Sequence, residues 1–166
     1  FGAGFQAVSV TVEPGPNLEA RARAARYAAL PAGVLTGHTL DDQAETVLLN
    51  LLRGSGSDGL AGMRAIGRTG VRRPLLGLRR AETAALCAEV GLVPVHDPTN
   101  DDPVHRRNRI RHELLPLLDD LAKRDVAALL ARQAAVWQVE ADWLDTAATA
   151  IDPTDARALA AAPVAL

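Results

Sequence analysis

Cysteine is almost absent from this sequence of 166 residues. The single cysteine, Cys87, excludes a disulfide within the chain and any zinc or iron–sulfur site built from several thiolates. Aromatic residues make up only 3%, so we expect an aliphatic core with closely packed helices. No run is long and apolar enough to span a membrane, and there is no basic and apolar leader. The expected compartment is therefore the cytoplasm.

An excess of positive charge is also lacking, because the net charge is −2. The charges are nevertheless unevenly distributed. Residues 60–80 carry six arginines and no acid, whereas residues 113–155 carry nine acids and three basic residues. This asymmetry predicts one face that meets a polyanion and another that is solvated.

The most informative stretch begins with residues 34–36, Val-Leu-Thr, which favour a short buried strand. Thr39 followed by Asp42 predicts a capping box at a helix start, and Gly54 predicts the end of that helix. One apolar stripe at helical spacing is expected to face the core. Its members are Leu40, Ala44, Val47, Leu48 and Leu51.

Three polar residues, His38, Asp42 and Glu45, lie beside this stripe. In open α/β sheets ligands bind beyond the carboxyl ends of the strands, which is where these residues are expected. Carboxylates beside a nucleotide can hold Mg²⁺, with water and phosphate completing its coordination. The alternative is that the acids only favour the positive end of the helix. Both acids are expected to flank the stripe, so that their amide replacements leave folding intact.

Arginines form two further groups. Arg23 and Arg26 lie on an alanine-rich helix, and Arg107 and Arg111 lie four residues apart at a basic helix start. Positive charge at a helix start does not serve the helix dipole. We therefore favour an external anion such as an RNA backbone over a surface of ion pairs as the partner of Arg107 and Arg111.

The remaining pattern alternates strands with helices. A strand, a crossover helix and a second strand form a βαβ unit, which predicts a parallel sheet. Expected strands cover residues 5–12, 64–68, 71–76 and 93–96. Expected helices cover residues 18–30, 79–90 and 106–150, the last interrupted near Pro116 and near Arg124.

Five motifs stand in one order along the chain. They are Glu19…Ala22-Arg23…Arg26-Tyr27; residues 37–46 (GHTLDDQAET) with the glycine-rich segments 53–56 and 59–63; residues 73–76 (RPLL); residues 97–101 (DPTND); and residues 107–113 (RNRIRHE). Together they resemble the tRNA(Ile)-lysidine synthetases, a family of PP-loop (N-type) ATP pyrophosphatases. The resemblance covers roughly residues 5–118.

This resemblance implies an α/β fold, with a Rossmann-like parallel sheet of the PP-loop ATPase type whose first strands are missing, followed by an all-helical C-terminal part. We divide the chain into a partial PP-loop domain, residues 1–104, and a helical tRNA-contacting appendage, residues 105–166. The segment 54–59 resembles the family's phosphate loop only superficially, because it follows a helix. The chain alone, truncated at its N-terminus, is therefore expected not to make AMP from ATP.

The resemblance also implies a reaction. The family uses ATP to adenylate O2 of the wobble cytidine in tRNA(Ile) with a CAU anticodon, and free lysine then displaces AMP to give lysidine. The implied ligands are ATP, Mg²⁺, lysine and that tRNA, and a homodimer is possible. A tRNA-thiolating PP-loop relative is one alternative, disfavoured by the single cysteine. A non-catalytic RNA-binding module is the other.

The site residues follow from matching the motifs. The expected catalytic residues are His38, Asp42 and Glu45, with Asp42 and Glu45 also expected to hold Mg²⁺. The residues expected to bind ATP or phosphate are Arg26, Gly37 and His38. Those expected to bind tRNA are Arg73, Arg107, Asn108 and Arg111.

Overall fold

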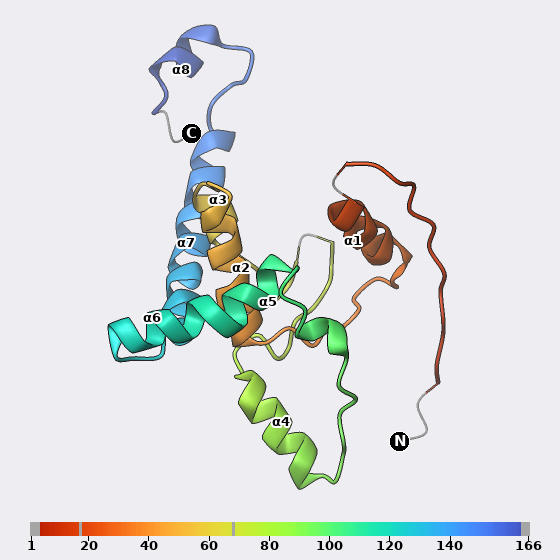
Figure 1. The fold of residues 1–166 in the computed structure, drawn as a ribbon. Helices are drawn as coiled ribbons and strands as arrows, with labels where there is room; N and C mark the ends of the chain where they lie inside the picture. The colour runs from red at the N-terminus through yellow and green to blue at the C-terminus, as the bar shows by residue number, and fades with distance from the viewer. Residues whose placement is uncertain (1–3, 17, 68, 164–166) are drawn as a thin grey trace.

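Helices account for most of the ordered elements in the computed structural model, which describes residues 4–16, 18–67 and 69–163 (Figure 1). The elements are α1 (Leu18–Ala29), α2 (Leu40–Leu52), α3 (Ser57–Leu60), α4 (Arg80–Glu89), η1 (Pro98–Asn100), α5 (Arg106–Arg109), η2 (Ile110–Leu114), α6 (Leu115–Ala122), α7 (Val126–Thr149) and α8 (Ala156–Ala161). The element η1 is a 3₁₀-helix and η2 is a π-helical turn. None of the helices described has the length and apolar character needed to cross a membrane.

Helix α2 begins with the predicted capping box. The Asp42 carboxylate accepts a hydrogen bond from the Thr39 backbone N–H at 2.8 Å, and the Thr39 hydroxyl accepts one from the Asp42 N–H at 3.5 Å. These two bonds satisfy backbone donors that a helix start otherwise leaves unpaired. Past the other end of α2, Gly54 has a φ of +74°. The predicted boundaries of this helix are confirmed.

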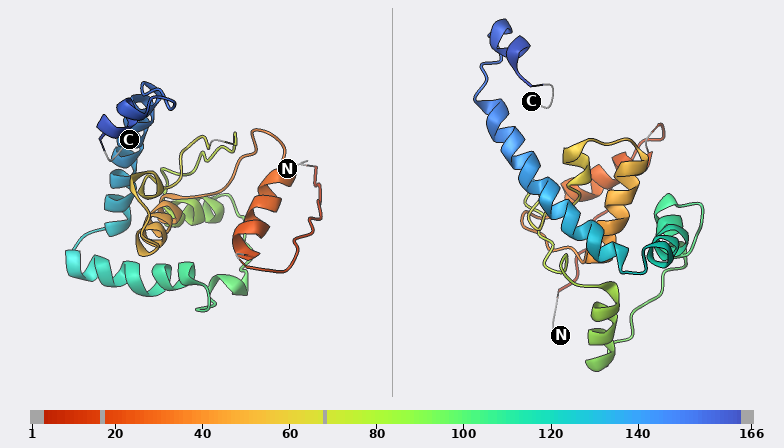
Figure 2. Two further views of the ribbon diagram at one scale, coloured as in Figure 1. Left: turned by 90° about the horizontal axis from the view of Figure 1, so that it is seen from above. Right: turned by 90° about the vertical axis from the view of Figure 1, so that its left-hand side faces the viewer.

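The core lies between α2 and the helices that follow residue 105. Helix α2 packs most extensively against α7, the longest helix (Figure 2). Its stripe residues Ala44, Val47 and Leu48 are buried, whereas Leu51 is 55% exposed, so the predicted stripe is one position too long. The core cluster is formed by Ala44, Leu48, Ile110, Leu115 and Ala127.

The structure does not show the predicted sheet among the residues it describes. What it has are two isolated bridges, one parallel between Leu35 and Arg72 and one antiparallel between Ile66 and Arg72. The parallel bridge has two hydrogen bonds of 2.9 Å, from the Thr36 N–H to the Arg72 carbonyl and from the Arg72 N–H to the Val34 carbonyl. Among the described residues, the parallel pairing that the sequence predicted is therefore present only between Leu35 and Arg72.

The strands predicted at 5–12 and 93–96 are wrong. Both segments are without strand structure, and Phe5 and Val93 are each 92% exposed. A β-favouring sequence becomes a strand only when neighbouring strands satisfy its backbone and cover its side chains. No such neighbour lies beside these segments in the described part of the chain.

The predicted interruption near Pro116 is also wrong, because the helix runs from α5 through η2 into α6. Proline removes one helical N–H and crowds the preceding turn. The wider π-turn at Ile110–Leu114 lies directly before Pro116, where it relieves that crowding. The break expected near Arg124 is confirmed. There Lys123 has a φ of +52°, and the Asp125 carboxylate caps α7.

The start of α2 lies in the middle of the molecule, between the other helices (Figure 1). Helix α8 lies beyond one end of α7, and α4 projects at the opposite end of the molecule (Figures 1 and 2). Helix α1 stands apart from α7 (Figure 1). Segments from α2, α4 and α5–η2 therefore meet at the N-terminal turns of α2, and their polar side chains form the site.

Candidate functional site

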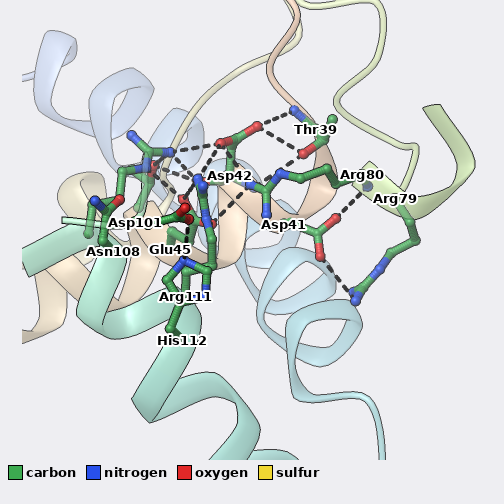
Figure 3. Close-up of polar contacts among 12 residues, drawn as sticks. Thr39, Asp41, Asp42, Glu45, Arg79, Arg80, Asp101, Asn108, Arg111 and His112 are labelled. Carbon is green, nitrogen blue, oxygen red and sulfur yellow. Dashed lines mark hydrogen bonds and ion pairs between the residues drawn. The ribbon is translucent and has the colours of Figure 1, made fainter. Parts of the chain in front are cut away.

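The centre of the site is the Glu45 carboxylate, which is completely buried although it is ionisable. Its Oε1 accepts hydrogen bonds from Arg80 Nη2 at 3.0 Å and Arg111 Nε at 2.7 Å. Its Oε2 accepts from Arg107 Nε at 2.6 Å and Arg111 Nη2 at 3.2 Å (Figure 3). Glu45 thus binds three guanidinium groups, one from the start of α4 and two from the continuous helix of α5 and η2. It fills a buried position instead of flanking the apolar stripe, which corrects the expectation from the sequence.

The Asp42 carboxylate lies beside Glu45 and is also fully engaged. Its Oδ2 accepts the N–H and the hydroxyl of Thr39, both at 2.8 Å. Its Oδ1 accepts from Arg80 Nη2 at 3.2 Å and from Arg107 Nη2 at 3.4 Å. Asp42 therefore both caps α2 and joins the arginine cluster.

Both carboxylates are ionised at neutral pH. Burial raises the pKa of Asp42, but the hydrogen bonds from Thr39 and the charges of Arg107 and Arg80 outweigh it, so the pKa lies below its ordinary value. Burial likewise raises the pKa of Glu45, and the hydrogen bonds and charges of Arg111 and Arg107 outweigh it. Hydrogen bonds to the charged form of an acid favour that form, which explains both directions.

The start of α4 is fastened to this cluster by two consecutive arginines. The Arg80 backbone N–H donates to Asp41 Oδ2 at 2.7 Å, and Arg79 Nη2 pairs with Asp41 Oδ1 at 3.0 Å (Figure 3). Arg79 Nη1 also pairs with Asp125 Oδ1 at 3.0 Å, at the start of α7. The sequence did not single out Arg80 as a site residue. Its only signal was membership of the acid-free basic segment 60–80.

His38 lies on the approach to the same cluster. Its Nδ1 is 2.8 Å from the Thr36 hydroxyl. Burial is the main cause of a lowered pKa for His38, and the nearby Asp42 carboxylate opposes it. The arginines that lower this pKa further are Arg73, Arg107 and Arg23. The imidazole is therefore neutral at pH 7.

Of the α1 arginines, Arg23 lies close enough to His38 for its charge to lower the pKa of that residue. The sequence-based preference was Arg26. Arg26 is exposed, and its guanidinium lies 5.8 Å from the ring centroid of Tyr27 on the same helix. The structure brings His38, Asp42, Glu45, Arg107 and Arg111 together and does not bring Arg26 to them.

Arg107 and Arg111 both form ion pairs with Glu45. The preference for an external anion over ion pairs is therefore wrong. Binding of an anion in addition to these ion pairs stays a prediction. Asn108 is buried, and its Nδ2 donates to the carbonyls of Thr99 and Asp102 at 2.9 Å each. Its side chain therefore holds the preceding loop in place. A role of Asn108 in binding tRNA stays a prediction.

Two other predicted residues lie nearer the surface. Arg73 is half-buried and donates from Nη1 to the Arg64 carbonyl at 2.8 Å. Gly37 is exposed, and a Cβ placed on it would meet nothing within 4 Å. Gly37 thus borders open space beside His38, which leaves room for a ligand.

The two acids do not fit Mg²⁺ in this arrangement. Each oxygen of Asp42 and Glu45 accepts hydrogen bonds, and three guanidinium charges surround them. Mg²⁺ needs carboxylate oxygens with open lone pairs and near-octahedral geometry. Within residues 4–16, 18–67 and 69–163 no group of three or more histidine, cysteine or acidic side chains could hold a metal ion. The acids serve as counter-ions of arginines here.

The two charge blocks seen in the sequence are partly counter-ions of each other. Arg64, from the basic block, pairs with Asp142 of α7 at 2.7 Å. Arg79, at the end of that block, pairs with Asp125. The prediction that the basic block forms one polyanion-binding face is therefore wrong for these two arginines.

Comparison with known families assigns the chain to a class of protein. Residues 4–118 match the PP-loop domain family, and the chain belongs to that family. Membership implies a Rossmann-like α/β fold, of which the described residues retain the parallel pairing of Leu35 with Arg72.

Within that class, the chain is similar to proteins named tRNA(Ile)-lysidine synthase. It is 48% identical to the one from Rhodococcus erythropolis, over 87% of this chain and 46% of that protein. It is 51% identical to the one from Mycolicibacterium paratuberculosis, over 86% of this chain and 46% of that protein. It is 47% identical to the one from Mycobacterium leprae, over 97% of this chain and 54% of that protein. The chain spans about half the length of these curated relatives.

Proposed function

We propose that the protein containing this chain joins free lysine to C2 of the wobble cytidine of tRNA(Ile) with a CAU anticodon, at the expense of ATP. In the first step cytidine O2 attacks the α-phosphate of ATP and pyrophosphate leaves. In the second step the lysine amine attacks C2, AMP leaves, and lysidine forms. The relatives and the family support this reaction. The observation that carries it is the convergence of the 37–46 and 107–113 motifs in one cluster around Glu45.

We infer that His38 accepts the proton that the lysine amine loses when it attacks. A general base must be unprotonated at the working pH, and burial keeps the pKa of His38 low. The Thr36 hydroxyl holds Nδ1 and so orients the ring. Asp42, which is only partly covered, is proposed to orient the reactants.

The remaining assignments are proposals of the same kind. Residues 1–104 would hold the nucleotide and residues 105–166 would contact tRNA, in a cytoplasmic protein that can form a homodimer. Gly37 borders open space beside His38, which supports its place in the nucleotide site. The proposal also includes Arg26 at a phosphate and Arg73, Arg107 and Arg111 at the tRNA.

The test is a reconstitution with the full-length protein, ATP, radiolabelled lysine and tRNA(Ile) with a CAU anticodon. We expect labelled lysine in the tRNA, with AMP and pyrophosphate in equal amounts. A tRNA(Ile) with a GAU anticodon, whose wobble base is not cytidine, is the matched control and should remain unlabelled. Incorporation of sulfur would favour a thiolating enzyme. RNA binding without AMP formation would favour a binding module.

A further inference from the structure

The cluster around Glu45 contains more positive than negative charge. Two carboxylates, Asp42 and Glu45, face three guanidinium groups, those of Arg80, Arg107 and Arg111. The neighbouring Asp41 pairs with Arg79, which is shared with Asp125. Counted over Asp42, Glu45 and these three arginines alone, the cluster carries one net positive charge.

The three guanidinium groups also have unused hydrogen-bond donors. Each arginine has five N–H donors. The hydrogen bonds within the cluster use Nη2 of Arg80 and both Nε and Nη2 of Arg107 and Arg111. In the described part of the chain, Nη1 of each of the three makes no hydrogen bond. Their side chains are 39%, 30% and 21% exposed, so the open edge of the cluster faces solvent.

Glu45 explains how three like charges can stay so close together. It is completely buried, and it fixes one guanidinium from α4, one from α5 and one from η2. Because these side chains are already fixed, less conformational entropy is lost when a ligand binds. Each unused Nη1 is a charged donor that can form a hydrogen bond to a phosphate oxygen, and arginine is well suited to binding phosphate.

We propose that Arg80, Arg107 and Arg111 form a binding site for a substrate phosphate group, and that Glu45 is the positioning residue that arranges them. This inference rests on the proposed function and deepens it, because Arg80 matches none of the motifs that suggested the reaction. The phosphate belongs either to ATP or to the tRNA backbone, and the chemistry of recognition is the same for both.

The test compares Arg80→Ala with Arg79→Ala in the full-length protein. Arg79 is the matched control, because it adjoins Arg80, is similarly exposed, and pairs with Asp41 and Asp125 instead of Asp42 and Glu45. The dissociation constants of ATP and of a tRNA(Ile) anticodon stem–loop are measured separately. We expect Arg80→Ala to weaken one of the two about tenfold or more, as loss of a charge-assisted hydrogen bond should. Arg79→Ala should change either constant by less than about threefold.

The two probes identify the source of the phosphate. Weaker binding of ATP alone assigns the site to the nucleotide. Weaker binding of RNA, with a shallower dependence on salt, assigns it to the tRNA backbone. Arg80→Lys keeps the charge but loses the planar fork, so it should retain part of the affinity. Urea unfolding of each variant establishes that both compared proteins are folded.

Wild-type affinity of Arg80→Ala for both probes would overturn the phosphate site, as would an equal loss in Arg79→Ala. Lysidine formation by the wild-type protein is measured in parallel. Binding that depends on Arg80 in a protein that makes no lysidine would refute the proposed function and leave the phosphate site standing. Lysidine formation without any role of Arg80 in binding would refute the phosphate site and leave the proposed function standing.

Discussion

Replacement of Glu45 by glutamine should lower the free energy of unfolding by about 3 kcal/mol at pH 7, the low end of the range for removing one partner of a buried ion pair. Glutamine has nearly the same shape, so no cavity opens. It loses the charge, however, and its amide N–H₂ faces guanidinium donors. The estimate stays at the low end because the three arginine side chains are 21–39% exposed and water partly screens them.

The effect should depend on pH in one direction. The folded-state pKa of Glu45 is depressed, because its arginine partners outweigh the effect of burial. A depressed pKa contributes stability above the unfolded-state pKa, about 4.3 for glutamate, and this stability is lost as the pH falls through the folded-state value. The difference between wild type and Glu45→Gln should therefore be complete at pH 7 and shrink below about pH 4.3.

Urea unfolding of the full-length protein, followed by circular dichroism across this pH range, measures the difference. Glu113→Gln is the control, because Glu113 also pairs with an arginine, Arg109, but both side chains are more than half exposed. Its stability should equal that of the wild type within error. If Glu45→Gln is as stable as Glu113→Gln at pH 7, the buried carboxylate does not hold the cluster together.

Four further substitutions test other parts of the structure. Asn108→Ala should cost about 1–3 kcal/mol in urea unfolding, because the buried amide loses its two hydrogen bonds to the carbonyls of Thr99 and Asp102, and should leave the salt dependence of tRNA binding unchanged. Gly62→Ala should destabilise more than Gly54→Ala. Both glycines have positive φ, but a Cβ on Gly62 would lie 2.9 Å from the Gln43 amide, whereas one on Gly54 meets nothing within 4 Å. Thermal unfolding of the pair measures this, and equal melting temperatures would contradict it. His38→Gln should lower kcat for lysidine about 100-fold with little change in the dissociation constants of ATP and RNA; an unchanged kcat would remove His38 as proton acceptor.

The sequence by itself determined helix α2 and its orientation toward the core. Its capping box joins residues three apart, and its buried residues Ala44, Val47 and Leu48 recur at helical spacing. Signals that act within one or two turns can be read from the chain directly. The motifs of residues 37–46 and 107–113 likewise indicated the family, which the match over residues 4–118 confirms.

Only the tertiary structure decided how the charges pair. Glu45 and Arg107 are 62 residues apart, and nothing local in either motif indicates that one neutralises the other. Arg80 reaches the same carboxylate from the start of a third helix. The segment 5–12 has a strand-like pattern but lacks a neighbour to pair with among the described residues. The ion pairs of this cluster and the predicted strands both need partners that are distant in sequence, and the fold alone decides whether those partners come into contact.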